Sequence, residues 1–216
     1  MTILRANDVA SVICARSAAS PTAMKLQKLL YYAQAWHLAV TDRPLFAEDV
    51  QAYRDGPVVP EVRWARRERE SRRPAVQQTT DIELDDLSSG VIDLIMAAYG
   101  SKSGDELSAL THDELPWREA RGDLPEGANG NTAISKLTMA DFYRTERKLG
   151  GRTAADLAAG GVVVEAPVAS SGRVDIAALL CDLPEFETAD PWGGANLHAR
   201  VDSHNRRSSG TPREAR

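Results

Sequence analysis

The sequence predicts a mainly α-helical protein: a compact multi-helix domain around one central amphipathic helix at about residues 20–41, with minor extended segments and an irregular C-terminal extension. Apolar residues recur at helical spacing through residues 26–40. Helix caps and glycine stops then recur as far as residue 150. Beyond it, alanine, glycine and serine dominate. We therefore expect a domain over 1–150 and a low-complexity extension over 151–216.

The composition is that of an ordinary soluble protein and excludes several classes. Of 216 residues, 43% are hydrophobic and 26% charged, and the net charge of -5 disfavours nucleic acid or an anionic membrane as partner. Cys14 and Cys181 are far apart, which predicts neither a disulfide framework nor a metal cluster and fits the cytoplasm. We expect no signal peptide, no membrane span, no metal and no cofactor.

The central helix is predicted from a single apolar stripe. Ser20 is the expected cap, Pro21 the first helical residue, and Pro44 the stop. The stripe consists of Leu26, Leu29, Leu30, Ala33, Trp36 and Val40. The polar residues expected outside it are Lys25, Gln27, Lys28 and Gln34. With aromatic residues at only 6%, the presence of Tyr31, Tyr32 and Trp36 here indicates a core helix.

Shorter elements are expected on either side. Asn7 is the expected cap of a first helix that ends near Arg16 and packs beside the central one. Residues 45–53 have no clean helical period and could be extended or a loose turn. Residues 56–60, with prolines at both ends of two valines, are predicted as a rigid elbow into a helix that starts near Glu61.

An arginine-rich run follows within residues 63–73 and allows two interpretations. It could be a basic patch for phosphates or an acidic partner. It could equally be a solvated helix face paired with the acidic residues at 81–86. We favour the second, because Trp64 is the only aromatic residue in the run and the chain is acidic.

Four further helices are predicted downstream. Ser88 or Ser89 is the expected cap of the most apolar one, which Gly100 ends. Two capping boxes, Ser103 with Glu106 and Thr111 with Glu114, predict two short helices, the second anchored by Trp117. Thr138 is expected to cap a last helix that stops at the glycine pair 150–151. An apolar island within 174–192 could order on a partner.

We find no constellation that predicts catalysis. The sequence has no phosphate-binding glycine loop, no nucleophile elbow and no zinc-ligand spacing. His112, Asp113 and Glu114 form one compact polar cluster, but the second capping box already accounts for Glu114. His37 is expected at the edge of the core, and the tryptophans are expected to pack rather than to act as hot spots.

Four sequence blocks resemble the Panacea (SocA-like) antitoxin family. They are Met24-Lys-Leu-Gln-Lys-Leu-Leu-Tyr-Tyr-Ala-Gln-Ala-Trp-His37, then Leu45-Phe46-Ala47-Glu48, then Gly56-Pro57-Val58-Val59-Pro60-Glu61-Val62, and Leu107-Ser108-Ala109-Leu110-Thr111-His112 followed by Pro116-Trp117. The segment 51–55 departs from the family pattern, which has a tryptophan after the alanine. The resemblance implies a helical domain that neutralises a toxin encoded beside it, with no catalysis and no cofactor.

The functional hypothesis is therefore an antitoxin that acts by direct protein binding in the cytoplasm. Its candidate contact residues are Trp36, His37, Gly56, Pro57, His112 and Trp117. The alternatives are a proteolytic adaptor that delivers a partner to a protease, or an uncharacterised enzyme that uses His112. The expected partner is a cognate toxin, with a protease or chaperone as a further candidate, and the sequence leaves a homo-oligomer open.

Overall fold

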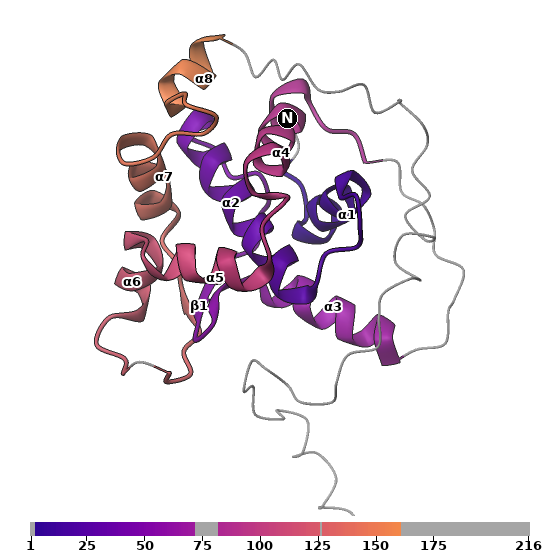
Figure 1. The fold of residues 1–216 in the computed structure, drawn as a ribbon, viewed down its shortest axis with the longest axis vertical. Helices are drawn as coiled ribbons and strands as arrows, with labels where there is room; N and C mark the ends of the chain where they lie inside the picture. The colour runs from indigo at the N-terminus through magenta and orange to yellow at the C-terminus, as the bar shows by residue number, and fades with distance from the viewer. Residues whose placement is uncertain (1–2, 72–81, 126, 161–216) are drawn as a thin grey trace, which may run out of the picture.

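The computed structural model describes residues 3–71, 82–125 and 127–160 (Figure 1). Over these residues it has eight helices and a small three-stranded sheet, which confirms the mainly helical prediction. The helices are α1 Ala6–Arg16, α2 Ala23–Thr41, α3 Pro60–Ser71, α4 Asp86–Tyr99, α5 Gly104–His112, α6 Leu115–Arg121, α7 Lys136–Thr145 and α8 Ala154–Gly160. The strands are β1 Gln51–Tyr53, β2 Gly56–Val58 and β3 Thr132–Ala133.

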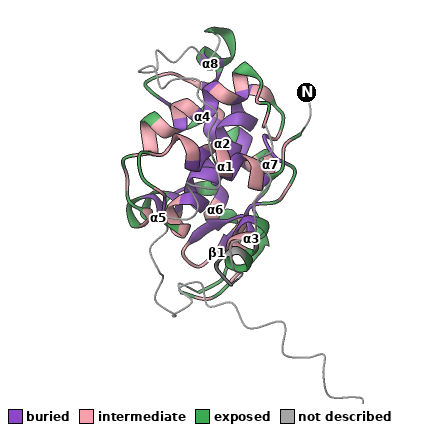
Figure 2. Cartoon of the chain, turned by 90° about the vertical axis from the view of Figure 1, so that its right-hand side faces the viewer, coloured by how far each residue is buried: buried purple, intermediate pink, exposed green. Residues whose placement is uncertain are grey.

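Helix α2 is the centre of the fold, as predicted, but it is not amphipathic. Helices α1, α4, α5, α7 and α8 and strand β2 all pack on it, and every residue from 26 to 40 is buried (Figure 2). The expectation that Gln27, Lys28 and Gln34 lie outside the buried stripe is wrong, because neighbours cover this helix on all sides. Four of its buried polar side chains have hydrogen-bond partners inside the protein: Gln27, Lys28, Gln34 and His37.

The ends of α2 are set by local hydrogen bonds. The Thr22 hydroxyl accepts a bond from the Lys25 N–H at 3.2 Å, so the helix starts after Thr22 and the predicted start near Ser20 was too early. At the other end Asp42 adopts φ 58°, a left-handed cap, two residues before Pro44. Helix α1 likewise lacks the predicted Asn7 cap. Instead the Glu48 carboxylate accepts from the Ala6 N–H at 2.9 Å.

The predicted elbow at 56–60 is the second strand of a hairpin. Strands β1 and β2 pair antiparallel with Gln51 opposite Val58 and Tyr53 opposite Gly56, and β3 joins the other edge of β1. Pro57 lies in the edge strand β2, where proline is tolerated, and Pro60 opens α3. The hairpin was not predicted because strands this short carry too little alternation to show a period.

Of the four caps predicted for the helices after α3, three differ from the structure. The capping box of Ser103 and Glu106 is confirmed. Asp85, rather than Ser88 or Ser89, caps α4, and Ser135, rather than Thr138, caps α7. The Thr111 and Glu114 box is wrong, since Thr111 lies inside α5 and the Glu114 carboxylate is buried elsewhere.

Several predictions fall on segments that the structure does not describe. They include the acidic partner Asp81, the end of the arginine-rich run and the apolar island at 174–192. Helix α8 follows the glycine pair at 150–151, where the sequence predicted the last helix to stop. Among the described helices, none has the length and hydropathy needed to cross a membrane.

The contribution of the buried polar side chains of α2 to stability can be tested at Gln34. Its amide donates to the Phe46 carbonyl at 2.9 Å and accepts from the Leu45 and Phe46 N–H groups at 2.8 and 3.2 Å. Gln34→Leu strands these three buried backbone groups. We expect the free energy of unfolding, measured by urea denaturation, to fall by about 3 kcal/mol.

The control is Gln51→Leu, because Gln51 is only partly buried on β1. It should change the free energy of unfolding by less than about 1 kcal/mol. Equal losses in the two variants would contradict the role assigned to the Gln34 amide.

Candidate functional site

Helix α2 carries a polar cluster near each end. Lys28 lies toward its start and His37 toward its end, about 14 Å apart along the axis at a rise of about 1.5 Å per residue. Lys28 faces the β1–β2 hairpin and α5, whereas His37 faces α4 and the loop after α2. The two clusters are separate sites.

The Lys28 ammonium holds the hairpin turn against the core. Its side chain is fully buried, and Nζ donates to the carbonyls of Asp55, at 2.5 Å, and Pro57, at 3.3 Å. The Ser108 hydroxyl of α5 donates to the same Asp55 carbonyl at 2.7 Å. Gly56 has φ 101°, and a Cβ there would lie 2.6 Å from Lys28 Nζ, so glycine is required at this turn.

Burial changes the titration of the groups beneath the turn. Desolvation lowers the pKa of Lys28 to about 7, although the Asp55 carboxylate opposes the change. Burial also lowers the pKa of His112, and the positive charge of Lys28 lowers it further. His112 is therefore a neutral imidazole at neutral pH.

An aromatic stack joins the hairpin to α5 and α6. The rings of His112 and Trp117 are 4.2 Å apart at 20°, and the Trp117 indole N–H donates to the Tyr53 carbonyl at 3.0 Å. The Arg121 guanidinium lies 5.5 Å from the centre of the Trp117 ring, within cation–π range. His112 and Trp117 each keep part of their surface in solvent. The hairpin, the end of α5 and the start of α6 therefore form one rigid surface, the hairpin–α5–α6 face.

Glu114 fixes the start of α6 to the core. Its carboxylate accepts from the Tyr143 hydroxyl at 2.6 Å and the Tyr31 hydroxyl at 3.0 Å, and Arg147 lies 3.7 Å away. Burial raises its pKa, while the tyrosine hydrogen bonds oppose this shift. Trp36 packs edge-on against Tyr143 with ring centres 5.4 Å apart. Glu114 occupies the N-cap position of α6, but its carboxylate anchors the helix to the core and does not cap it.

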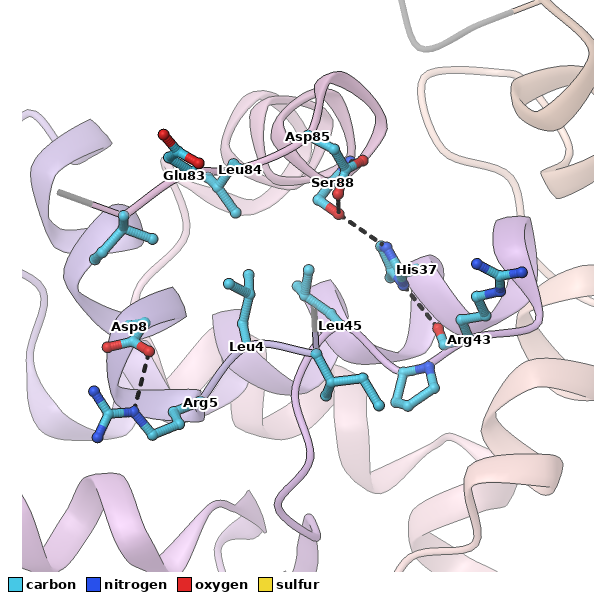
Figure 3. A pocket seen from close by; sticks show the side chains of 13 residues that line it. Leu4, Arg5, Asp8, His37, Arg43, Leu45, Glu83, Leu84, Asp85 and Ser88 are labelled. Carbon is cyan, nitrogen blue, oxygen red and sulfur yellow. Dashed lines mark hydrogen bonds and ion pairs between the residues drawn. The ribbon is translucent and has the colours of Figure 1, made fainter. Parts of the chain in front are cut away.

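His37 lies in the other cluster and lines one end of a surface cavity (Figure 3). Its Nδ1 lies 2.7 Å from the Arg43 carbonyl and its Nε2 3.1 Å from Ser88 Oγ. The Ser88 hydroxyl in turn donates to Asp85 at 2.8 Å. Burial lowers the pKa of His37, so the ring is neutral at pH 7 and its Nδ1–H can donate to Arg43. Nε2 is then an acceptor that competes with Asp85 for the single Ser88 hydroxyl proton. This confirms the prediction of a hydrogen-bonded histidine at the core edge.

Part of the chain is similar to a known protein family. Residues 26–118 match the family model described as antitoxin SocA-like, Panacea domain. Over these residues the chain is similar to the SocA-like Panacea domain. The match runs from α2 into α6, and it supports an antitoxin role. Comparisons with curated proteins and with solved structures give no match.

The structure brings together four of the six predicted contact residues. Gly56, Pro57, His112 and Trp117 lie at the hairpin–α5–α6 face, the first two buried and the last two partly exposed. Trp36 is fully buried in the core, and His37, with 3% of its surface exposed, lies in the other cluster. In this conformation Trp36 has no surface to offer a partner.

Sequence reasoning missed the residues that support the face. Lys28 and Ser108 hold the turn through contacts that are distant in sequence, and the helical period placed Lys28 among solvent-facing residues. The turn signal at Asp55 and Gly56 was visible, but its partners were not. Over the described residues, no group of three or more histidine, cysteine, aspartate or glutamate side chains could hold a metal ion.

Lys28 makes a testable contribution to the pH dependence of stability. With a pKa of about 7 when folded and 10.5 when unfolded, the unfolded chain binds more protons between these values. The free energy of unfolding of the wild type, relative to Lys28→Met, should therefore rise by up to about 1.4 kcal/mol per pH unit from pH 7 toward 10. Urea denaturation at several pH values measures this difference.

The control is Lys25→Met, which removes an ammonium from a half-buried position on the same helix. The free energy of unfolding is plotted against pH for each variant. The difference between the two slopes reports the contribution of the buried Lys28 amine. Parallel slopes would mean that Lys28 keeps its proton in the fold.

Proposed function

We propose that this protein is an antitoxin that acts in the cytoplasm and neutralises a toxin encoded next to it by direct binding. The observation that carries the proposal is the match of residues 26–118 to the SocA-like Panacea domain, which supports the antitoxin role. We further propose that the hairpin–α5–α6 face, with His112 and Trp117, contacts the toxin.

The geometry of this face supports the assignment. Trp117 and His112 present aromatic surface that is already ordered by a stack and a hydrogen bond, so little conformational entropy is lost on binding. Tryptophan is among the residues most enriched at interface hot spots, and the buried Arg121 guanidinium lies over the Trp117 ring and supports it. Leu115, which is 53% exposed, adds apolar area at the junction of α5 and α6.

The geometry favours a recognition role for His112 over that of a catalytic base. One ring face is stacked on Trp117, and its Nε2 is buried without a hydrogen-bond partner among the described residues. A general base needs an accessible nitrogen within hydrogen-bond reach of a substrate proton. Binding to a protein surface requires only the exposed ring edge.

Co-expression tests the function directly. The neighbouring open reading frame, induced alone, should stop growth, and co-induction of this protein should restore colony counts. A neighbour that is harmless alone, or that stays lethal with this protein present, contradicts the proposal. The toxin's half-life, measured in the same cells, separates blocking from proteolytic delivery, since an adaptor shortens it.

A matched pair of variants tests the face. Leu115→Glu places a charge at the exposed start of α6, within the proposed contact. A glutamate in this first turn is favoured by the helix dipole, so the helix should be kept. We expect toxin binding, measured by calorimetry, to weaken at least about tenfold, as for an apolar contact within an interface. Circular dichroism should show an unchanged fold.

Leu137→Glu is the control, because Leu137 is 71% exposed on α7, outside the proposed face. It should leave the affinity within about twofold. If Leu137→Glu weakens binding and Leu115→Glu does not, the toxin binds elsewhere on an antitoxin whose function still stands.

A further inference from the structure

The described residues leave a cavity of about 530 Å³ between the N-terminal segment, the loop after α2 and the segment that leads into α4 (Figure 3). This volume falls within the range of about 300–1,000 Å³ typical of small-molecule sites. It lies at the His37 end of α2, and the antitoxin function proposed above makes no use of it. Backbone hydrogen bonds from Leu4 to Leu45 and from Ala47 to Leu4 hold its floor, so the cavity is preformed.

The middle of the cavity is apolar and its ends are polar. Leu4, Leu45 and Leu84 point toward one another across it. The Arg5–Asp8 ion pair, with a distance of 3.3 Å, lies at one end. The chain formed by His37, Ser88 and Asp85 lies at the other. An aliphatic body with one polar head fits such a lining.

Charge decides which kind of head group the His37 end accepts. Burial opposes ionisation of Asp85, but hydrogen bonds from the Ser88 N–H and hydroxyl hold its pKa below the usual value, so it is an anion at neutral pH. His37 is neutral there. Arg43 and Glu83 point away from the centre of the cavity, and Arg5 is paired with Asp8. The polar end therefore offers the Asp85 carboxylate and the Ser88 hydroxyl oxygen to a hydrogen-bond donor.

We propose that this cavity is a binding site for a small aliphatic cation, whose alkyl chain packs between Leu4, Leu45 and Leu84 and whose ammonium group bonds at Asp85 and Ser88. An anionic head would meet the Asp85 carboxylate and is disfavoured. A bound cation would connect the N-terminal segment to the first turn of α4. Its alkyl chain would contact Leu4, and its ammonium group would contact Asp85 and Ser88.

Titration of the full chain with a homologous series tests the site. The probes are butyl-, hexyl- and octylammonium, with hexanoate as the anion of matched length, followed by ¹H–¹⁵N NMR at pH 7.5 and low salt. We expect the amide signals of Leu4, Leu84 and Ser88 to shift. Each added methylene should tighten binding by about fourfold, and hexanoate should bind at least about tenfold more weakly than hexylammonium.

Two neighbouring aspartates supply the variant and its control. Asp85→Asn removes the charge but keeps the α4 cap, because asparagine caps as well as aspartate, and should weaken hexylammonium binding by about three- to tenfold. Asp86→Asn removes a charge one residue later, from an exposed position that does not line the cavity, and should change binding less than about twofold.

Three results would overturn the proposal: equal binding of hexanoate and hexylammonium, shifts confined to residues outside the lining, or Asp85→Asn binding as tightly as the wild type. Toxin neutralisation by Asp85→Asn is a separate readout. It should stay intact, since the cavity and the hairpin–α5–α6 face lie at opposite ends of α2.

Discussion

The complete burial of α2 is the constraint on which the rest of the structure depends. A helix covered on every side has no solvent to satisfy its polar side chains, and four of them bond to the protein backbone instead. Gln27 accepts from the Val59 N–H at 2.7 Å, Lys28 donates to two hairpin carbonyls, Gln34 bonds three times to Leu45 and Phe46, and His37 contacts the Arg43 carbonyl. All four therefore bond to backbone within residues 43–59. The helix thus dictates the path of the chain that follows it, which explains how strands of only three residues keep a fixed place.

The same bonds account for the rigidity of the hairpin–α5–α6 face. The Asp55 carbonyl accepts from both Lys28 and Ser108, so the turn is tied to α2 and α5 at one atom. The indole of Trp117 ties β1 to α6, and Glu114 ties the start of α6 to α2 and α7. A face held in this way loses little freedom when a partner binds, so more of the contact energy remains as affinity. Its partly exposed aromatic side chains should therefore contribute more to binding affinity than the same side chains on a mobile loop.

The sequence predicted local features well and long-range ones poorly. The central helix, the capping box of Ser103 and Glu106, and the buried histidine are read from neighbours within a turn or two, and the structure confirms them. The role of Glu114 was misread, because a serine or threonine three residues before a glutamate predicts a capping box whether or not a tyrosine pair lies nearby in the fold. For the site, four predicted residues do lie together, but the lysine beneath them was missed. A helical period reports which side chains share a face, and it carries no information on how many faces are covered.

The choice of lysine at position 28 has a physical consequence for this fold. A buried ion pair or charge is often less stabilising than an apolar residue of the same size, so leucine here would pack at least as well. Leucine, however, would leave the carbonyls of Asp55 and Pro57 without their donor, and the turn could then adopt other conformations. With a pKa near 7, Lys28 can donate these bonds as a largely neutral amine at mildly alkaline pH, which lowers the cost of burying a charge. Gly56 completes the arrangement, because any side chain there would occupy the space of Nζ. Lys28 and Gly56 together therefore specify one conformation of the turn. That conformation positions the hairpin, which Trp117 and His112 connect to α5 and α6.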